Sequence, residues 1–484
     1  MSESDSLASE LRDLEQLVSS LQLREKDLLD QLRQTRSALE PLRSRVRLLK
    51  NSGAPILKLP TELLSAILVK AHAIEDRAGC PFEVRISHVC QRLRDVAIST
   101  SPIWTTFKIC LWRWPPEFHR MYLERSRRMP LNATFHSHGK TPREVVARMT
   151  NLLDNIIIRV RSLSLIFDVD HFGYNLAKDY LCGIRAPHLE HFRVVAPGAS
   201  LQPFFIISGA PVLKSLDLTS CMPTDLSLIS KVTRLKLKVI PVLNLSSPIC
   251  ASLACFSRLT HLTLEGWIPT MVQTFITLPH LRILGIHCTG ISEHLIRFPT
   301  ILRTPALESL AFNGAVADGV VRFFNLLGSL PSNTFPKLRS VALFYSTLCP
   351  LEEPANLPWV EPRSSPHPFS TVERLSLVGF TGNDTESILA ELYNGERYSP
   401  SLFPKLHTLA LVDTTLDLST LTSTLASRDA LRQVASFRTV QLPQAELMRL
   451  RGTPAYEALE RRARITSFDP SGLARFYGFA APRR

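Results

Sequence analysis

The amino-acid sequence predicts an α/β protein in which an N-terminal coiled-coil helix and a small helical bundle precede a curved solenoid with parallel strands. Three patterns lead to this prediction. Leucines recur at heptad spacing through the first fifty residues. A densely apolar helix then follows the Leu-Pro pair at residues 59 and 60. From residue 160 onward, a short apolar skeleton recurs at intervals of 19 to 34 residues.

Residues 1–50 carry the seam of a coiled coil. Thirteen positions are spaced alternately four and three residues apart, and all but two are apolar: Leu7, Leu11, Leu14, Val18, Leu21, Glu25, Leu28, Leu32, Thr35, Leu39, Leu42, Val46 and Leu49. Such a narrow stripe is buried by pairing with another helix, so we expect self-association or a partner helix. The alternative is a single amphipathic helix folded back on its own chain. Pro41 predicts that the helix ends or kinks near Leu39, because proline cannot donate a helical hydrogen bond.

Short helices are predicted across residues 56–110. Pro60 suits the first turn of a helix, where its missing N–H would have no partner anyway. The apolar stripe of this helix follows directly: Leu63, Leu64, Ile67 and Leu68. A second amphipathic helix carries Val89, Leu93, Val96 and Ala97, and it ends near Trp104. Helices this short cannot bury so much aliphatic surface among themselves, so part of it should face another surface.

Residues 56–110 resemble an F-box through three motifs in chain order. The family pattern is Leu-Pro-x-Glu-Leu-Leu, then a Val-Cys-x-x-Trp-Arg helix, then Leu-Trp. The matching residues here are Leu59, Pro60, Glu62, Leu63 and Leu64, then Val89, Cys90, Gln91, Arg92, Leu93 and Arg94, then Ile103 and Trp104. Leu93 stands where many members have tryptophan, so this position keeps an apolar side chain without the aromatic ring. The heptad helix, this segment and the leucine-rich remainder together resemble F-box proteins that are abundant in mushroom-forming fungi.

The resemblance implies a set of partners. An F-box binds a small adaptor of the Skp family, which links it to a cullin ubiquitin ligase. The residues that the resemblance assigns to adaptor binding are Leu59, Pro60, Glu62, Leu63, Leu64, Ile67, Leu68, Val89, Cys90, Leu93 and Trp104. An apolar helix laid in a groove is a common recognition mode, which agrees with this assignment. The alternative is an ordinary internal helix pair.

A repeat of three apolar residues at relative positions 0, +3 and +5 occupies residues 158–445. Its copies are Val160-Leu163-Leu165, Leu189-Phe192-Val194, Leu213-Leu216-Leu218, Val232-Leu235-Leu237, Leu259-Leu262-Leu264, Leu281-Leu284-Ile286, Leu307-Leu310-Phe312, Leu338-Val341-Leu343, Val372-Leu375-Leu377, Leu406-Leu409-Leu411 and Phe437-Val440-Leu442. This is the leucine-rich-repeat pattern, whose strands stack in parallel into a curved solenoid. The asparagine usual at +8 is absent, so irregular turns are expected.

The residue between the last two apolar positions of each copy should lie on the concave face, because neighbouring residues of a strand point to opposite faces. We call these residues the middle row: Arg193, Asp217, Lys236, Thr263, Gly285, Ala311, Ala342, Ser376 and Ala410. The first members are charged or polar and the later ones are small. We expect a protein target to bind here, held by charge near Arg193, Asp217, Lys236 and Thr263 and packed closely over Ala342 and Ala410.

The remaining segments are predicted to flank the repeat. Residues 111–157 form a linker and a cap for the solenoid, with a first strand in "MPLNATFH" and a helix over 141–156 that starts with a capping box. Residues 349–368 are rich in proline and predict an exposed loop. Residues 446–484 are predicted to be a basic C-terminal tail that caps the far end.

Composition and motifs narrow the function classes. The net charge of +13 is spread thinly, without the coherent basic face that nucleic-acid binding needs. No stretch is long and apolar enough for a membrane span. Nine scattered cysteines without a Cys-x-x-Cys pair predict reduced thiols in the cytoplasm or nucleus. No catalytic, cofactor or metal-binding motif is found, so we expect no enzyme, cofactor or metal site.

These patterns favour a substrate-recognition adaptor of a cullin-type (SCF) ubiquitin ligase. In this interpretation the F-box binds the Skp-family adaptor and the solenoid binds a target protein. The alternative is an oligomeric protein-interaction scaffold that takes no part in ubiquitin transfer.

Overall fold

The structure is a computed structural model of residues 1–484. It describes residues 3–74, 80–110, 116–137, 143–167, 185–196, 202–204, 209–223, 229–239, 253–266, 275–287, 301–315, 334–345, 369–380, 383, 385–386, 388–389, 403–412, 418–429 and 435–479. The chain forms two compact units. The helical unit comprises residues 1–105 and 120–129, and the solenoid unit comprises residues 106–119 and 130–484. The proline-rich segment 349–368 lies outside the described residues.

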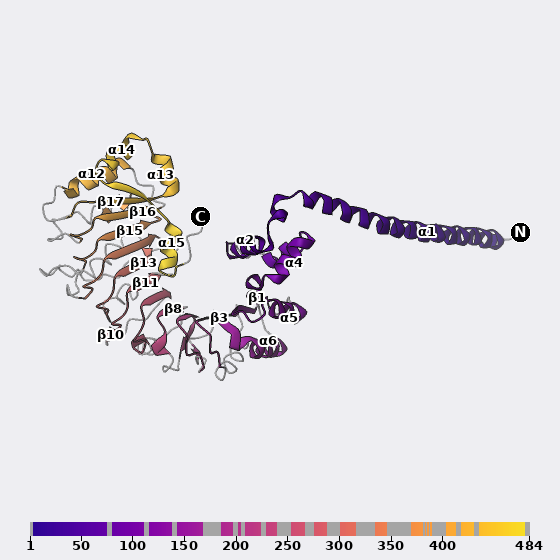
Figure 1. Ribbon diagram of the computed structural model, residues 1–484, viewed down its shortest axis with the longest axis horizontal. Helices are drawn as coiled ribbons and strands as arrows, with labels where there is room; N and C mark the ends of the chain where they lie inside the picture. The colour runs from indigo at the N-terminus through magenta and orange to yellow at the C-terminus, as the bar shows by residue number, and fades with distance from the viewer. Residues whose placement is uncertain are drawn as a thin grey trace. The chain divides into compact units, whose positions relative to one another are not determined.

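The helical unit begins with one long helix, α1 (Glu3–Ser52), drawn in indigo in Figure 1. The short helices predicted after it are present: α2 (Thr61–Ile74), α3 (Phe82–Ser87) and α4 (Gln91–Ser99), with 3-10 turns η1 (Pro55–Lys58) and η2 (Ser101–Trp104). Of the expected end or kink near Leu39, the end is wrong, because α1 continues through Pro41 to Ser52. A proline removes a single helical hydrogen bond, and the flanking turns keep theirs.

One parallel sheet organises the solenoid unit. Its strands are β1 (Thr106–Cys110), β2 (Leu131–Ser137), β3 (Val160–Phe167), β4 (His191–Val195), β6 (Ser215–Thr219), β8 (Arg234–Val239), β9 (His261–Gly266), β11 (Ile283–His287), β13 (Ser309–Ala315), β14 (Ser340–Tyr345), β15 (Arg374–Val378), β16 (Thr408–Val412), β17 (Thr439–Pro443) and β18 (Arg464–Phe468). The strands pair in this order, which is chain order, and many are visible along an arc in Figure 1.

The eleven predicted repeat copies form the core of this sheet. Each anchor residue at 0, +3 and +5 is buried, and none is more than 5% exposed. Two of the +8 positions are also apolar and buried, namely Cys221 and Phe380. The core therefore fills the position at which the usual repeat carries asparagine.

Backbone hydrogen bonds form a ladder at the start of the strands. The carbonyl of the residue after the first anchor accepts two N–H groups from the next repeat. Glu190, for example, accepts from Lys214 and Ser215 at 2.9 and 3.0 Å. The same double acceptance recurs at Lys214, Thr233, Thr260, Arg282, Glu308, Arg339, Glu373 and His407. This ladder does not depend on side-chain identity, so the repeats keep register while their lengths vary.

The sheet extends beyond residues 158–445 in both directions. The predicted capping strand is present as β2, and β1 precedes it within the segment that was expected to belong to the helical bundle. At the other end β18 pairs with β17, so residues 446–484 are not simply a tail. Two small sheets, β5 (Gln202–Phe204) with β7 (Cys221–Pro223) and β10 (Ile276–Thr277) with β12 (Leu302–Arg303), accompany the main one.

Helices and 3-10 turns connect the strands. The helix predicted over residues 141–156 is present as α6 (Arg143–Ile156), and η3 (Ile157–Arg159) links it to β3. Further along are η4 (Ile229–Lys231), α12 (Leu418–Asp429), α13 (Gln444–Leu450) and α14 (Pro454–Glu460). The last helix is α15 (Pro470–Phe476), and its position on the sheet matters for function.

Candidate interaction surfaces

The helical unit divides its apolar side chains between a core and a surface. Leu64, Leu68, Leu93, Ile103 and Trp104 are buried, none more than 6% exposed. Four of these residues, Leu64, Leu68, Leu93 and Trp104, had been assigned to adaptor binding. The structure instead places them inside the unit, because helices α2 and α4 pack on each other and on the turn that carries Trp104.

Trp104 is the centre of that core. Its indole Nε1 donates a 2.7 Å hydrogen bond to the carbonyl oxygen of Ala97. The Tyr122 ring, from the second half of α5 (Pro116–Arg125), meets it edge to face with ring centroids 5.1 Å apart. The Arg125 guanidinium lies 4.4 Å from the Trp104 ring centroid. The helix does end at the turn that carries Trp104, and α5 is a partner that sequence reasoning missed.

A buried polar cluster lies within the same unit. The Tyr122 hydroxyl donates a hydrogen bond to the Glu83 carboxylate, and His72 Nε2 lies 3.5 Å from the other oxygen of Glu83. Burial and the negative charge of Glu83 both raise the pKa of Tyr122 above its ordinary value. The hydroxyl therefore stays protonated and serves as a fixed donor to a buried carboxylate.

One group of exposed apolar side chains of the unit lies on α2 and just before α4. Leu63 is 52% exposed, Ile67 is 41% exposed and Val89 is 63% exposed. The Arg92 guanidinium donates a 2.6 Å hydrogen bond to the carbonyl oxygen of Leu59, which holds the start of α4 beside the start of α2. Pro60 and Glu62 at this end are exposed, while Leu59 and Cys90 are half-buried. This set forms the α2–α4 surface: Leu59, Pro60, Glu62, Leu63, Ile67, Val89 and Cys90.

The heptad seam of α1 is also exposed. Leu11, Leu14, Leu21, Leu28 and Leu32 are each between 46% and 60% exposed. The structure therefore does not bury this stripe against the described residues of its own chain. An unburied heptad stripe is the state expected for one helix of a coiled coil taken without its partner.

The middle row of the solenoid is confirmed as one continuous line across the sheet. Strand register aligns Arg193 with Asp217, Asp217 with Lys236, and Lys236 with Thr263. It continues through Gly285, Ala311, Ala342, Ser376 and Ala410. We call the sheet face that carries this row the inner face, since the repeat anchors occupy the opposite one.

Charged side chains pair with one another at the polar end of the inner face. Arg193 lies 3.2 Å from Asp217, and Glu265 lies 3.5 Å from Lys236, 3.8 Å from Lys238 and 3.3 Å from the His287 imidazole. Burial raises the pKa of Asp217, against the opposing effect of Arg193. Burial alone would also raise the pKa of Glu265, but the hydrogen bond with His287 and the two lysines hold it at about 2.

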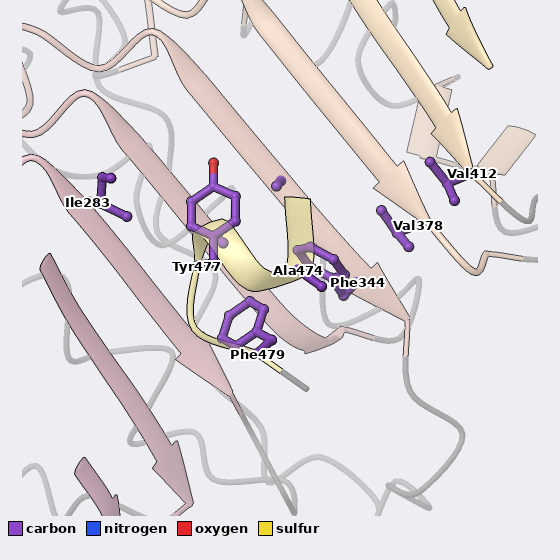
Figure 2. Close-up of a cluster of buried hydrophobic side chains, with 9 residues drawn as sticks. Ile283, Phe344, Val378, Val412, Ala474, Tyr477 and Phe479 are labelled. Carbon is purple, nitrogen blue, oxygen red and sulfur yellow. The ribbon is translucent and has the colours of Figure 1, made fainter. Parts of the chain in front are cut away.

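The chain's own C-terminal segment covers the other end of the inner face. Figure 2 shows α15 crossing the strands, with Tyr477 and Phe479 among side chains of the sheet. The buried cluster comprises Ile283, Ala311, Ala342, Phe344, Val378, Val412, Ala474, Tyr477 and Phe479. Ala342 and Ala410 were predicted to leave room for a target; both are fully buried. Over Ala342, this room is taken by the C-terminal segment.

Two side chains of the inner face hold this segment by its backbone. Thr263 Oγ1 donates a 2.7 Å hydrogen bond to the carbonyl oxygen of Tyr477, and Lys236 Nζ donates one of 2.8 Å to that of Gly478. Gly285 leaves the necessary space, because a Cβ there would lie 2.9 Å from the Tyr477 oxygen. Gly478 has a φ of +76°, a conformation that glycine adopts without strain.

Comparisons with known proteins do not identify a family for this chain. No protein-family model matches the sequence, and no curated protein matches it. A Bacteroides fragilis protein solved in a structural genomics programme is 13% identical, with a TM-score of 0.32, over 71% of this chain and 76% of its own. A leucine-rich-repeat protein of Leptospira interrogans is 13% identical, with a TM-score of 0.21, over 73% of this chain and 92% of its own.

The architecture is shown by the spacing of the repeats and by the register of the strands in this chain. The solenoid unit is leucine-rich-repeat-like. Its parallel strands follow chain order, and every predicted anchor is buried. Solenoids of this kind present an extended inner surface for binding.

The described residues give no sign of other chemistry. Among them, no group of three or more histidine, cysteine, aspartate or glutamate side chains is arranged to hold a metal ion. None of the helices in the described ranges is long and apolar enough to cross a membrane. Burial raises the pKa of the Cys221 thiol, which keeps it protonated and unreactive.

Proposed function

We propose that this chain is a substrate-recognition adaptor of a cullin-type ubiquitin ligase. In this function the α2–α4 surface binds a Skp-family adaptor, and the inner face of the solenoid binds a protein target. The observation that carries the proposal is the exposure of Leu63, Ile67 and Val89 beside the buried core of the bundle. The resemblance of residues 59–64 and 89–94 to an F-box supports the identity of the partner.

The division of α2 into two faces gives the proposal its geometry. Leu64 and Leu68 lie in the core, whereas Leu63 and Ile67 are one helical turn apart on the outside. An amphipathic helix with a second apolar face suits a groove on another protein. Each exposed side chain, once fully buried, would contribute about 1.5–3 kcal/mol.

The chain lowers no chemical barrier in this function. It holds a target near a ubiquitin-charged enzyme, which raises the effective concentration of the target at that enzyme. A chain with one binding surface on each unit can hold the ligase adaptor and the target at the same time.

The test is co-expression of the full chain with a Skp-family adaptor, followed by co-purification. Leu63→Asp combined with Ile67→Asp should abolish the complex, because two carboxylates would be buried without partners. Both positions are exposed in the free chain, so the variant should fold. Met448→Asp is the matched control, since Met448 is 65% exposed on α13 of the solenoid unit and should leave the complex intact. A wild-type chain that binds no adaptor would overturn the proposal.

The alternative function is an oligomeric scaffold without ubiquitin transfer. The exposed heptad seam of α1 favours self-association of the chain. This alternative becomes the better account if the wild-type chain self-associates but binds no Skp-family adaptor.

A further inference from the structure

The inner face over β11–β16 is an apolar site that already has an occupant. That occupant is the C-terminal segment, residues 470–479. Tyr477 and Phe479 are 1% and 4% exposed. The Phe344 ring meets both edge to face, with centroids 6.4 Å from Tyr477 and 5.3 Å from Phe479.

The hydrogen bonds that hold the C-terminal segment can also be made by another peptide. Lys236 and Thr263 donate to backbone carbonyls, and every residue type has a backbone carbonyl. The remaining requirements are two aromatic side chains and a small residue between them, as in Tyr477-Gly478-Phe479. The site therefore recognises a short motif. Its backbone carbonyls accept from Lys236 and Thr263, its two rings pack on the sheet, and the hydroxyl of Tyr477 adds hydrogen bonds with Ser309 and Ser340.

The segment can also leave without dismantling a repeat. The anchors of all repeats lie on the opposite face of the sheet, and the strand ladder runs from repeat to repeat without α15. Helix α15 has seven residues, a length that is not stable as a helix by itself, and it follows the last strand of the sheet. A short helix that lies outside the hydrogen-bonded strand ladder is a usual site of local opening.

We propose that the C-terminal segment is an internal ligand that occupies the target site and is displaced by a target peptide of the form aromatic–small–aromatic. This inference rests on the target-binding half of the proposed function and needs no ubiquitin ligase. The target peptide places its two rings where Tyr477 and Phe479 lie, and its backbone carbonyls accept from Thr263 and Lys236. Proteins that lack such a motif do not displace the segment and therefore do not bind the inner face.

The test uses full-length chains and a fluorescent synthetic peptide with the sequence of residues 468–479. The double variant Tyr477→Ser with Phe479→Ser weakens the internal ligand while the sheet is unchanged. It should bind the peptide at least tenfold more tightly than the wild-type chain does, as measured by fluorescence anisotropy. A peptide that carries the same two serines should not bind.

Matched variants locate the site. Phe476→Ser removes the neighbouring aromatic ring, which is 51% exposed, and should behave as the wild-type chain does. Adding Lys236→Met to the double variant should weaken peptide binding about tenfold, because one carbonyl loses its donor. Adding Gly285→Val should abolish it, because the new side chain fills the space next to the Tyr477 carbonyl. A folded double variant that binds no peptide would overturn the inference.

Hydrogen exchange of the wild-type chain gives a second test if the double variant fails to fold. The amide of Phe479 donates to the carbonyl of Ala474 at 2.9 Å, so its exchange reports opening of the segment. The amides at 477–479 should exchange faster than those of β13–β15. Exchange at the same rate as these strands would show that the segment opens only when the solenoid unfolds, which would also overturn the inference. Adaptor binding is measured in neither test, so a failed F-box proposal stays distinguishable.

Discussion

At the scale of single residues, the structure adds polar contacts that link distant parts of the sequence. Arg428 is fully buried, and its guanidinium donates to the carbonyls of Phe403, Leu406 and Ala435 at 2.8, 3.0 and 3.0 Å. Tyr122 and Glu83, which hydrogen-bond in the helical unit, are 39 residues apart. No local pattern marks any of these residues, because a buried polar side chain is identified by its distant partners. Apolar spacing, in contrast, predicted all eleven sets of repeat anchors.

The Tyr122–Glu83 hydrogen bond should stabilise the helical unit. Tyr122→Phe keeps the ring on Trp104 but removes one donor from a buried carboxylate, which should cost about 1–3 kcal/mol. Urea unfolding of the full chain, followed by tryptophan fluorescence, measures this change. Tyr456→Phe is the control, because the Tyr456 hydroxyl has no hydrogen-bond partner among the described residues, and it should change stability little. Equal stability of the wild-type chain and Tyr122→Phe would contradict the prediction.

At the scale of elements, the sequence predicted the helices and strands whose apolar residues recur at a regular spacing. The heptad spacing predicted α1, and the Leu-Pro pair marked the start of α2. The extent of α1 past Pro41 was missed, because the rule that proline ends helices holds less strictly where the neighbouring turns remain intact. Strands β1 and β18 were missed because neither carries the leucine spacing of the repeat.

The seam of α1 should hold chains together. Leu21 lies on the seam and is 56% exposed, while Leu23 lies on the opposite face and is 64% exposed. Leu21→Glu should weaken self-association at least tenfold, because it puts a charge into the paired interface. Leu23→Glu should leave it unchanged. Sedimentation velocity over a range of concentrations measures both, and equal effects of the two variants would contradict a specific seam.

At the scale of the whole molecule, the candidate sites were only partly predictable. Sequence periodicity placed the middle row correctly, since it depends on alternation along one strand. It could not show that the segment after β18 returns to that row, because Tyr477 and Thr263 meet across 214 residues of sequence. The split of α2 between core and surface likewise depends on how α4 packs against it.

The solenoid should lose stability in acid through Glu265. Its folded pKa of about 2 lies below the ordinary value of 4.5. The ionised form is therefore favoured in the folded state, and the resulting stability is present above about pH 4.5 and lost as the pH falls toward 2. Glu265→Gln should remove a contribution on the order of 2–3 kcal/mol at pH 7 and make little difference near pH 2.

Unfolding in urea at pH 7 and pH 2.5 measures this contribution. Glu308→Gln is the comparison, because the Glu308 side chain is 40% exposed and pairs with Arg282 at 2.8 Å in contact with solvent. It should change stability by less than Glu265→Gln does at pH 7. A Glu265→Gln chain with the pH dependence of the wild type would show that the ion-pair cluster around Glu265 is not responsible.

The return of the C-terminal segment to the inner face also sets an order of events during protein synthesis. Thr263 is made 214 residues before Tyr477, which corresponds to about 10–40 s of translation. Phe344, Val378 and Val412 are made within this interval, before the segment that covers them. The nascent chain thus exposes an apolar surface until residues 470–479 have left the ribosome. A chain whose synthesis stops before residue 470 keeps that surface exposed, which makes it a substrate for chaperones and proteases.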